Sequence, residues 1–256
     1  MESSIVWRET VRLNWRDVDF RNRLRPAALL SMMQEAAGHD AARLGFGHDR
    51  IAPLGIAWVL ARFSLEMQRW PGWDEDLVVE TWSKGAESLY GLRDFRFLDA
   101  AGQELGLASS VWLLIDAAAR RPVRPDILGQ PLPGDPARQA LPGKPGKLVA
   151  AVPLAAIGEH RIDYSDLDHH RHVNNASYVA MAMDCLPLDF LAASTVASLQ
   201  VNYLAEALGG ETLEFWAGEE EGGSQFIEAR NHDRQQVAVR MRLRWSAAAL
   251  PAVPAP

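Results

Sequence analysis

The feature that most constrains this chain is an internal repeat. Residues 12–19 (RLNWRDVD) match residues 161–168 (RIDYSDLD) at a constant offset of 149. Further along, residues 63–70 match residues 199–206 at an offset of 136. Tandem copies of one unit can join their sheets edge to edge, which protects the strand edges from stray pairing. The repeat therefore predicts a pseudo-dimer built within one chain.

Each copy shows the same order of predicted elements: a short strand (10–16 and 160–165), a polar loop, a long helix and four alternating strands. The first helix is expected to begin at Pro26, because proline suits the first helical turn. The second is expected to begin at an N-cap of Asn174 or Asn175, with apolar spacing that runs to Leu188. Such a helix is best buried by a sheet wrapped around it, so we expect an α+β fold. The predicted strands are 56–68, 76–84, 90–98 and 105–115 in the first copy, and 195–204, 212–219, 225–231 and 236–245 in the second.

The segment between the copies sets the expected domain boundaries. Residues 122–146 are rich in proline and glycine, which is typical of a linker. We expect an N-terminal domain over residues 1–128, a linker over residues 129–150 and a C-terminal domain over residues 151–256. Because the fused pair supplies the second unit, both a monomer and a homodimer are compatible with the repeat.

Composition narrows the class of protein. The formal net charge of −7 argues against broad nucleic-acid binding. No stretch approaches the ~18 uninterrupted apolar residues of a membrane helix, and residues 1–8 lack the apolar core of a signal peptide. Cys185 is the only cysteine, so no intrachain disulfide forms and a reducing compartment is expected. We therefore expect a cytoplasmic protein that binds no nucleic acid and does not insert into a membrane.

The polar loop of the second copy concentrates the groups that carry chemistry. It reads DLDHHRHVNN over residues 166–175, directly before the second predicted helix. In the first copy Arg23 faces His172, so only the second copy keeps the imidazole. A helix N-terminus can hold a developing oxyanion, and a histidine can transfer protons near neutral pH. The sequence contains no serine-nucleophile elbow and no phosphate loop, so water is the natural attacking group.

Three interpretations of this loop remain open from the residues alone. Asp168, His169, His170 and His172 could bind a metal ion, although neighbours along one loop rarely all point at one ion. The loop could instead serve only to cap the helix. It could also be catalytic, in which case it needs a carboxylate from elsewhere in the chain.

At this point the loop resembles a known family. Asp168–Tyr178 is similar to the D-x-N-x-H-V-N-N-x-x-Y stretch of acyl-acyl-carrier-protein thioesterases, known from plant plastids and many bacteria. Gly55–Arg62 (GIAWVLAR) resembles another segment of that family, and the resemblance covers nearly the whole chain. It implies two tandem hotdog domains, each an antiparallel sheet wrapped around a long central helix. That fold agrees with the repeat.

The resemblance also implies a set of catalytic residues. Asp168 and His172 match catalytic positions of the family, and Glu206 matches a catalytic glutamate on the following strand. Glu206 would activate water or attack directly. His170 stands where the family has asparagine, and we assign it to the catalytic set as well. In the first half Trp70 stands at the position of Glu206, so one active site is expected.

The implied activity is hydrolysis of fatty acyl thioesters on acyl carrier protein, releasing free fatty acid in fatty acid biosynthesis, with no cofactor and no metal. Backbone N–H groups of Val173 and Asn174 would hold the oxyanion. Met32 and Trp58 would line an acyl pocket in the first domain. Arginines between residues 16 and 25 would contact the acidic carrier protein. The alternatives are a broad acyl-CoA thioesterase and a non-catalytic acyl-binding or dehydratase-like hotdog protein.

Overall fold

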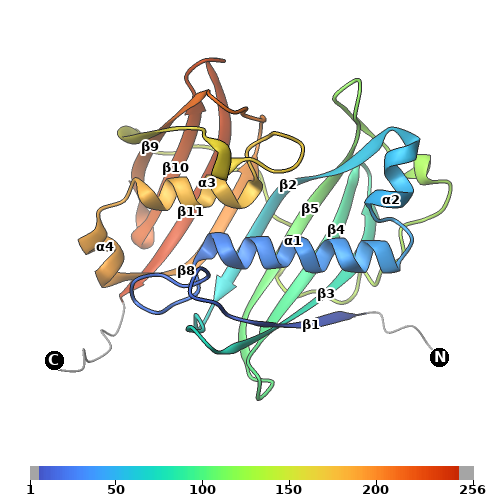
Figure 1. Ribbon diagram of the computed structural model, residues 1–256, viewed down its shortest axis with the longest axis horizontal. Coiled ribbons are helices and arrows are strands. Elements are labelled where there is room, and N and C mark those ends of the chain that lie inside the picture. Colours follow the sequence, from blue (N-terminus) through green and yellow to red (C-terminus); the bar gives the residue numbers. More distant parts are fainter. Residues whose placement is uncertain (1–5, 248–256) are drawn as a thin grey trace.

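The computed structural model describes residues 6–247 and arranges their strands in one antiparallel sheet (Figure 1). The ends of the two expected domains, residues 1–5 and 248–256, lie outside the described residues. Along the sheet the order is β1-β3-β4-β5-β2-β8-β11-β10-β9-β7, with β6 paired to β5. The strands are β1 Trp7–Arg12, β2 Ile56–Met67, β3 Asp76–Glu87, β4 Tyr90–Leu98, β5 Glu104–Asp116, β6 Arg121–Val123, β7 Ala155–Arg161, β8 Ser194–Tyr203, β9 Thr212–Glu220, β10 Ser224–Asn231 and β11 Gln236–Ala247.

The two halves meet where β2 pairs with β8. In this antiparallel register Ser64 lies opposite Gln200, and these two residues are related by the offset of 136 found in the sequence. A residue that pairs with its own repeat equivalent marks a local two-fold axis. The expected edge-to-edge pairing of the two sheets is therefore confirmed.

Two long helices lie on the same face of the sheet, side by side and running in opposite directions (Figure 1). They are α1 Pro26–Arg43 and α3 Asn175–Asp184, and each turns its apolar side into the core. The side-chain amide of Asn175 donates to Oε1 of Gln34 at 2.9 Å, which ties the start of α3 to the middle of α1. The shorter helices are α2 His48–Ile51 and α4 Leu188–Ala193, with 3-10 turns η1 Ala52–Leu54, η2 Pro125–Leu128, η3 Tyr164–Asp166 and η4 Glu221–Gly223.

Three elements end earlier than the sequence predicts. The strand expected over residues 160–165 is β7, which spans Ala155–Arg161, because the N–H of Asp163 then donates to the carboxylate of Asp166 at 2.8 Å and the chain turns into η3. The strand expected over residues 10–16 is β1, which stops at Arg12, because the backbone N–H of Asn14 turns to the carboxylate of Asp17 at 2.7 Å. The second helix ends at Asp184 rather than running to Leu188. Pro187 lacks an N–H and cannot continue a helix, so the chain breaks there and restarts as α4.

The segment over residues 129–150 crosses the face of the sheet opposite to the helices. Leu141 and Leu148 are buried there. The N–H of Leu148 donates to Oδ1 of Asn202 at 2.8 Å, and the N–H of Ala140 donates to Oδ2 of Asp94 at 2.7 Å. Although its composition is that of a flexible linker, this segment is fixed along the sheet. No helix within residues 6–247 is both long and apolar enough to cross a membrane.

Candidate active site

The polar loop of the second half is shaped by the carboxylate of Asp168. Its Oδ1 accepts the backbone N–H groups of His170 at 2.8 Å and of His172 at 3.1 Å. The N–H of Asp168 donates to the carbonyl of His172 at 2.8 Å, and Arg171 adopts a left-handed φ of 64°. Asp168 therefore fixes the backbone that carries His172, rather than the imidazole ring itself.

The first half builds the same loop around Asp19. Its Oδ1 accepts the N–H groups of Arg21 at 2.8 Å and of Arg23 at 3.0 Å, and its own N–H donates to the carbonyl of Arg23 at 2.8 Å. Asn22 takes the left-handed position with φ 55°. These are the bonds of the Asp168 loop at the offset of 149, so the backbone scaffold is duplicated and only the side chains on it differ.

The loop of the second half ends at the N-cap of α3. The side chain of Asn174 accepts the N–H of Ala176 at 2.8 Å, which confirms one of the two expected caps. The N–H of Val173 donates to the carbonyl of Ala207 at 3.0 Å, and that of Asn174 donates to the carbonyl of Asp166 at 2.8 Å. Both amides are engaged within the protein. The expectation that they hold an oxyanion does not fit this geometry.

Glu206 meets His172 at the edge of this loop. Oε2 of Glu206 lies 3.5 Å from Nε2 of His172, and both side chains are partly exposed. Glu206 does not lie on a strand as expected: β8 ends at Tyr203, where the N–H groups of Leu204 and Ala205 both turn to the carbonyl of Ala238. The chain leaves the sheet there, and this turn places the carboxylate beside the imidazole.

A third side chain reaches this pair from the other half of the molecule. Arg120, in the turn between β5 and β6, forms an ion pair with Oε2 of Glu206 through Nη1. Its Nη2 lies 3.4 Å from Nε2 of His172. The sequence presents Arg120 only as part of a basic run with Arg121 and Arg124, which is typical of a solvated surface. No sequence signal connects it to Glu206.

Three imidazoles gather beside the catalytic candidates. The rings of His169 and His170 lie 3.8 Å apart between centroids, and His48 of α2 lies about 6 Å from each. Partial burial and the neighbouring His169 lower the pKa of His170 below its usual 6.5, so the ring is neutral near pH 7. Among residues 6–247 no group of three or more His, Cys, Asp or Glu side chains is arranged to hold a metal ion.

Two cavities meet at His170. An open, polar hollow of about 960 Å³ lies over the loop, and a more apolar cavity of about 580 Å³ extends into the first half between the helices and the sheet. Trp58 lines the second cavity, with its indole N–H donating to the carbonyl of Phe46 at 3.1 Å. Met32 is packed against the core and is not among the lining residues.

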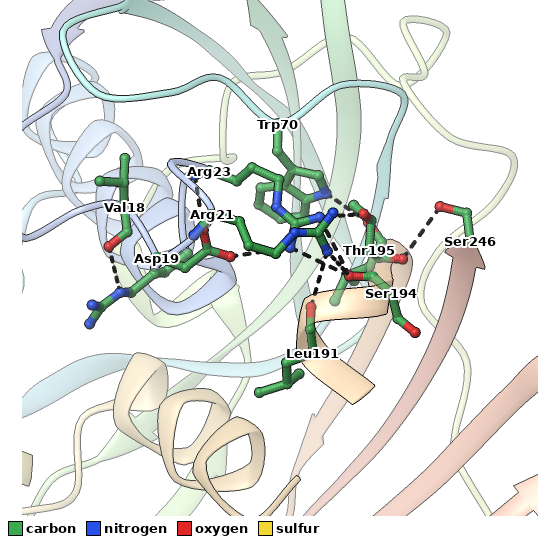
Figure 2. A network of polar contacts seen from close by, with 11 residues as sticks. Val18, Asp19, Arg21, Arg23, Trp70, Leu191, Ser194, Thr195 and Ser246 are labelled. Carbon is green, nitrogen blue, oxygen red and sulfur yellow. Dashed lines mark hydrogen bonds and ion pairs between the residues drawn. The ribbon is translucent and has the colours of Figure 1, made fainter. Parts of the chain in front are cut away.

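The equivalent place in the first half is filled by arginine and tryptophan (Figure 2). Arg21 donates to the carbonyls of Leu191 and Ser194, at 3.1 and 2.8 Å. Arg23, at the position of His172, binds the hydroxyl of Thr195 and the carbonyl of Ser194. Trp70, at the position of Glu206, is buried and donates to the carbonyl of Val196 at 2.7 Å. These groups join the two halves, and Arg21 and Arg23 are therefore committed to internal contacts.

An antiparallel sheet wrapped around a long helix is the hotdog fold, and this molecule contains it twice. The second half carries His172 and Glu206 beside the polar hollow, Arg120 reaches them from the first half, and the first half has Arg23 and Trp70 at the positions of the histidine and the glutamate. Fold and site together define a double-hotdog protein with a single polar site.

Comparison with known proteins identifies the family. Residues 4–128 match the family model for the acyl-ACP thioesterase N-terminal domain, and residues 154–247 match that for the C-terminal domain. The chain belongs to the acyl-ACP thioesterase family.

Individual relatives agree with that assignment. The chain is 26% identical to an oleoyl-acyl carrier protein thioesterase of Coriandrum sativum over 80% of its own length and 60% of the relative's. It thus spans less than two thirds of the length of that plant relative. An acyl-ACP thioesterase from Bacteroides thetaiotaomicron has the same fold, with a TM-score of 0.86 and 24% identity over 94% of this chain and 98% of that one. A 12:0-ACP thioesterase from Umbellularia californica gives a TM-score of 0.77 and 22% identity over 96% and 99% of the two chains.

Proposed function

We propose that this protein hydrolyses fatty acyl thioesters carried on acyl carrier protein and releases free fatty acid in fatty acid biosynthesis. The observation that carries the proposal is the pairing of Glu206 with His172 at 3.5 Å, beside the polar hollow that His172 lines and that meets the apolar cavity at His170. A carboxylate and an imidazole are the groups that activate water, and neither is kept in the duplicated loop of the first half. Membership of the thioesterase family supports the same reaction.

The proposed reaction adds water across the thioester. Glu206 takes a proton from water as the oxygen attacks the carbonyl carbon, which gives a tetrahedral oxyanion. The intermediate collapses by breaking the C–S bond, and the thiolate takes the proton back through Glu206 or His172. Asp168 acts as a positioning residue, because it holds the backbone of His172. The products are a carboxylic acid and the free thiol of the carrier.

The acyl chain is proposed to enter the apolar cavity of the first half. That cavity starts at His170 beside the catalytic candidates and continues along α1 to Trp58. Burial of a methylene contributes about 0.8 kcal/mol, so a cavity of this kind can select chain length. The first half would then bind the substrate while the second half supplies the acid–base pair.

The thioester is proposed to arrive on a carrier protein rather than on CoA. Carrier protein is acidic, and two exposed arginines lie at this site: Arg171 lines the polar hollow, and Arg120 contacts Glu206 and His172. The decisive experiment compares one acyl group on carrier protein and on CoA at low and high salt. A carrier rate that falls steeply with salt while the CoA rate stays flat would support the carrier. Equal responses would favour a broad acyl-CoA thioesterase.

We also propose a cellular setting and a domain division. The lone, half-buried Cys185 suits the reducing cytoplasm. Residues 1–128 and 151–256 are proposed as the two domains, joined by residues 129–150. Because β2 and β8 already pair the two halves, a monomer is expected, and its mass by light scattering would test this.

A further inference from the structure

The active-site candidates of the second half are completed by a residue of the first. Arg120 contacts both Glu206 and His172, from a turn that lies 86 and 52 residues away in sequence. A guanidinium group carries five N–H donors in one plane. After one contact to the carboxylate and one toward the imidazole, donors on the same plane are left to face a third group.

The turn that carries Arg120 is built to hold it in place. Oδ1 of Asp116 accepts the N–H groups of Ala118 at 2.9 Å and of Ala119 at 2.7 Å. The N–H of Arg120 donates to the carbonyl of Asp116 at 2.9 Å, and that of Ala117 donates to the carbonyl of Gly55 at 2.8 Å. These bonds fix the turn to the ends of β5 and β2.

Arg120 itself adopts a left-handed backbone with φ 55°. This conformation costs a residue with a Cβ atom roughly 1–2 kcal/mol, which is why glycine usually occupies such a position. Backbone strain of this kind gathers at functional sites, where the surrounding structure holds a side chain in a working position. At Arg120 this conformation directs the side chain from the first half toward Glu206 of the second half.

Thioester hydrolysis needs a donor for the oxyanion, and the expected amides do not supply it. The N–H of Val173 is bound to Ala207, and that of Asn174 is bound to Asp166. Arg120 is the cationic side chain that touches both Glu206 and His172. A cation at this point also offsets the negative charge that forms when water attacks.

We propose that Arg120 is a catalytic residue that donates hydrogen bonds to the thioester carbonyl oxygen and stabilises the oxyanion. This role rests on the proposed hydrolysis. As water adds to the carbonyl carbon, the C=O π electrons move onto the oxygen facing Arg120, and the proton of water goes to Glu206. When the C–S bond breaks, that electron pair reforms the carbonyl and the sulfur leaves as a thiolate. Arg120 keeps its proton throughout, since arginine stays protonated in proteins.

The test uses the full chain and two substrates with the same acyl group, one on carrier protein and one on N-acetylcysteamine. Arg120→Gln should lower kcat by about 100- to 1000-fold on both, the loss typical of removing one oxyanion donor, with little change in KM. Arg120→Ala should regain activity when guanidinium ion is added at concentrations that leave the wild type folded. The matched control is Arg12→Gln, which removes an equally exposed arginine paired with Asp74 and Asp76 and should leave kcat unchanged.

Two results would overturn the role of Arg120. If Arg120→Gln raises KM for the carrier-protein substrate and leaves both kinetic constants for the N-acetylcysteamine substrate unchanged, Arg120 only binds the carrier protein. If both Arg120 variants keep the wild-type kcat on both substrates, it takes no part in catalysis. Thermal melts of each variant separate lost folding from lost chemistry, and rescue by guanidinium remains informative for a destabilised variant. Loss of activity in Glu206→Gln with full activity in Arg120→Gln would reject this role and leave the proposed hydrolysis intact.

Discussion

Oε2 of Glu206 lies 3.5 Å from Nε2 of His172, and at the equivalent positions of the first half Trp70 and Arg23 bind main-chain and hydroxyl oxygens instead. The two loops share their backbone hydrogen bonds, so the two halves differ at this place in the side chains that the common backbone carries. Duplication gave the chain two loops with the same backbone hydrogen bonds. The loop of the second half carries His172 near Glu206, and the loop of the first half forms contacts between the two halves.

The first prediction concerns this pair. Glu206→Gln and His172→Ala should each lower kcat by about 100- to 10,000-fold, because each removes a group that moves a proton in the transition state. The measurement is the rate of thioester cleavage, monitored through the thiol that is released. The matched control is the surface pair Glu214 and His232, which meet at 2.9 Å in the same half but away from the site. Glu214→Gln and His232→Ala should leave kcat unchanged; full activity in both site variants would mean that the site is elsewhere.

The second prediction concerns His170 and pH. Burial lowers the pKa of His170 below 6.5, so its neutral ring can donate and accept a hydrogen bond at pH 7, as the family's asparagine does. His170→Asn should therefore change kcat at pH 8 by less than about tenfold, or about 1.4 kcal/mol. Because the folded state disfavours the charged ring, wild-type stability should fall as pH drops below the unfolded value of 6.5.

Thermal melts at pH 8 and pH 5.5 test the stability part of this prediction. The drop in Tm between these pH values should be smaller in His170→Asn than in the wild type. A drop of the same size in both proteins would show that other groups set the acid sensitivity. A large loss of activity at pH 8 would instead assign the imidazole a role that a carboxamide cannot fill.

The third prediction concerns a buried ion pair between α1 and β4. Asp40 is fully buried and accepts from Arg43 at 2.6 Å and from Arg93 at 2.7 Å. Breaking a buried pair leaves a charge without its partner, which costs about 3–5 kcal/mol. Asp40→Asn should lower the free energy of unfolding in urea by an amount of that order. Asp126→Asn, in an exposed pair with Arg124 at 3.6 Å, is the control and should cost less than about 1 kcal/mol.

The fourth prediction concerns the acyl cavity. Trp58→Ala should enlarge it and shift the preferred acyl chain to greater length, by about fourfold in kcat/KM for each added methylene accommodated. Gly91→Ala should shift it the other way, since a Cβ there would lie 3.1 Å from the indole of Trp58. A panel of thioesters of increasing length is the measurement. Met32→Ala, which alters core packing outside the cavity, should lower Tm and leave the length profile unchanged.

Most of the fold could be predicted because its signals are local. Alternation of apolar residues located the eight meander strands closely, including β4 at Tyr90–Leu98 without error. The turn of residues 99–102 joins two of these strands, and Gly102 takes a left-handed φ of 82° there. The early ends of β1 and β7 were missed because the carboxylates of Asp17 and Asp166 accept backbone N–H groups just after these strands. The early end of α3 was missed although Pro187 follows it. The short helices α2 and α4 are too brief to show a helical period.

The candidate site divides in the same way. The sequence by itself determined that the chain is a duplicated unit, that only the second loop carries His172, and that Trp70 stands at the position of Glu206 in the first half, because each of these is read from residue identity and spacing. The hotdog fold followed from the resemblance to the thioesterase family. Only the tertiary structure decided that the amides of Val173 and Asn174 are already bonded, and that Arg120 contacts Glu206 and His172. The hydrogen bonds of these amides join the loop to carbonyls of the same half, and the contact of Arg120 forms across the halves that β2 and β8 pair. Contacts across such a joint leave no periodic trace along the chain, since they join residues far apart in sequence.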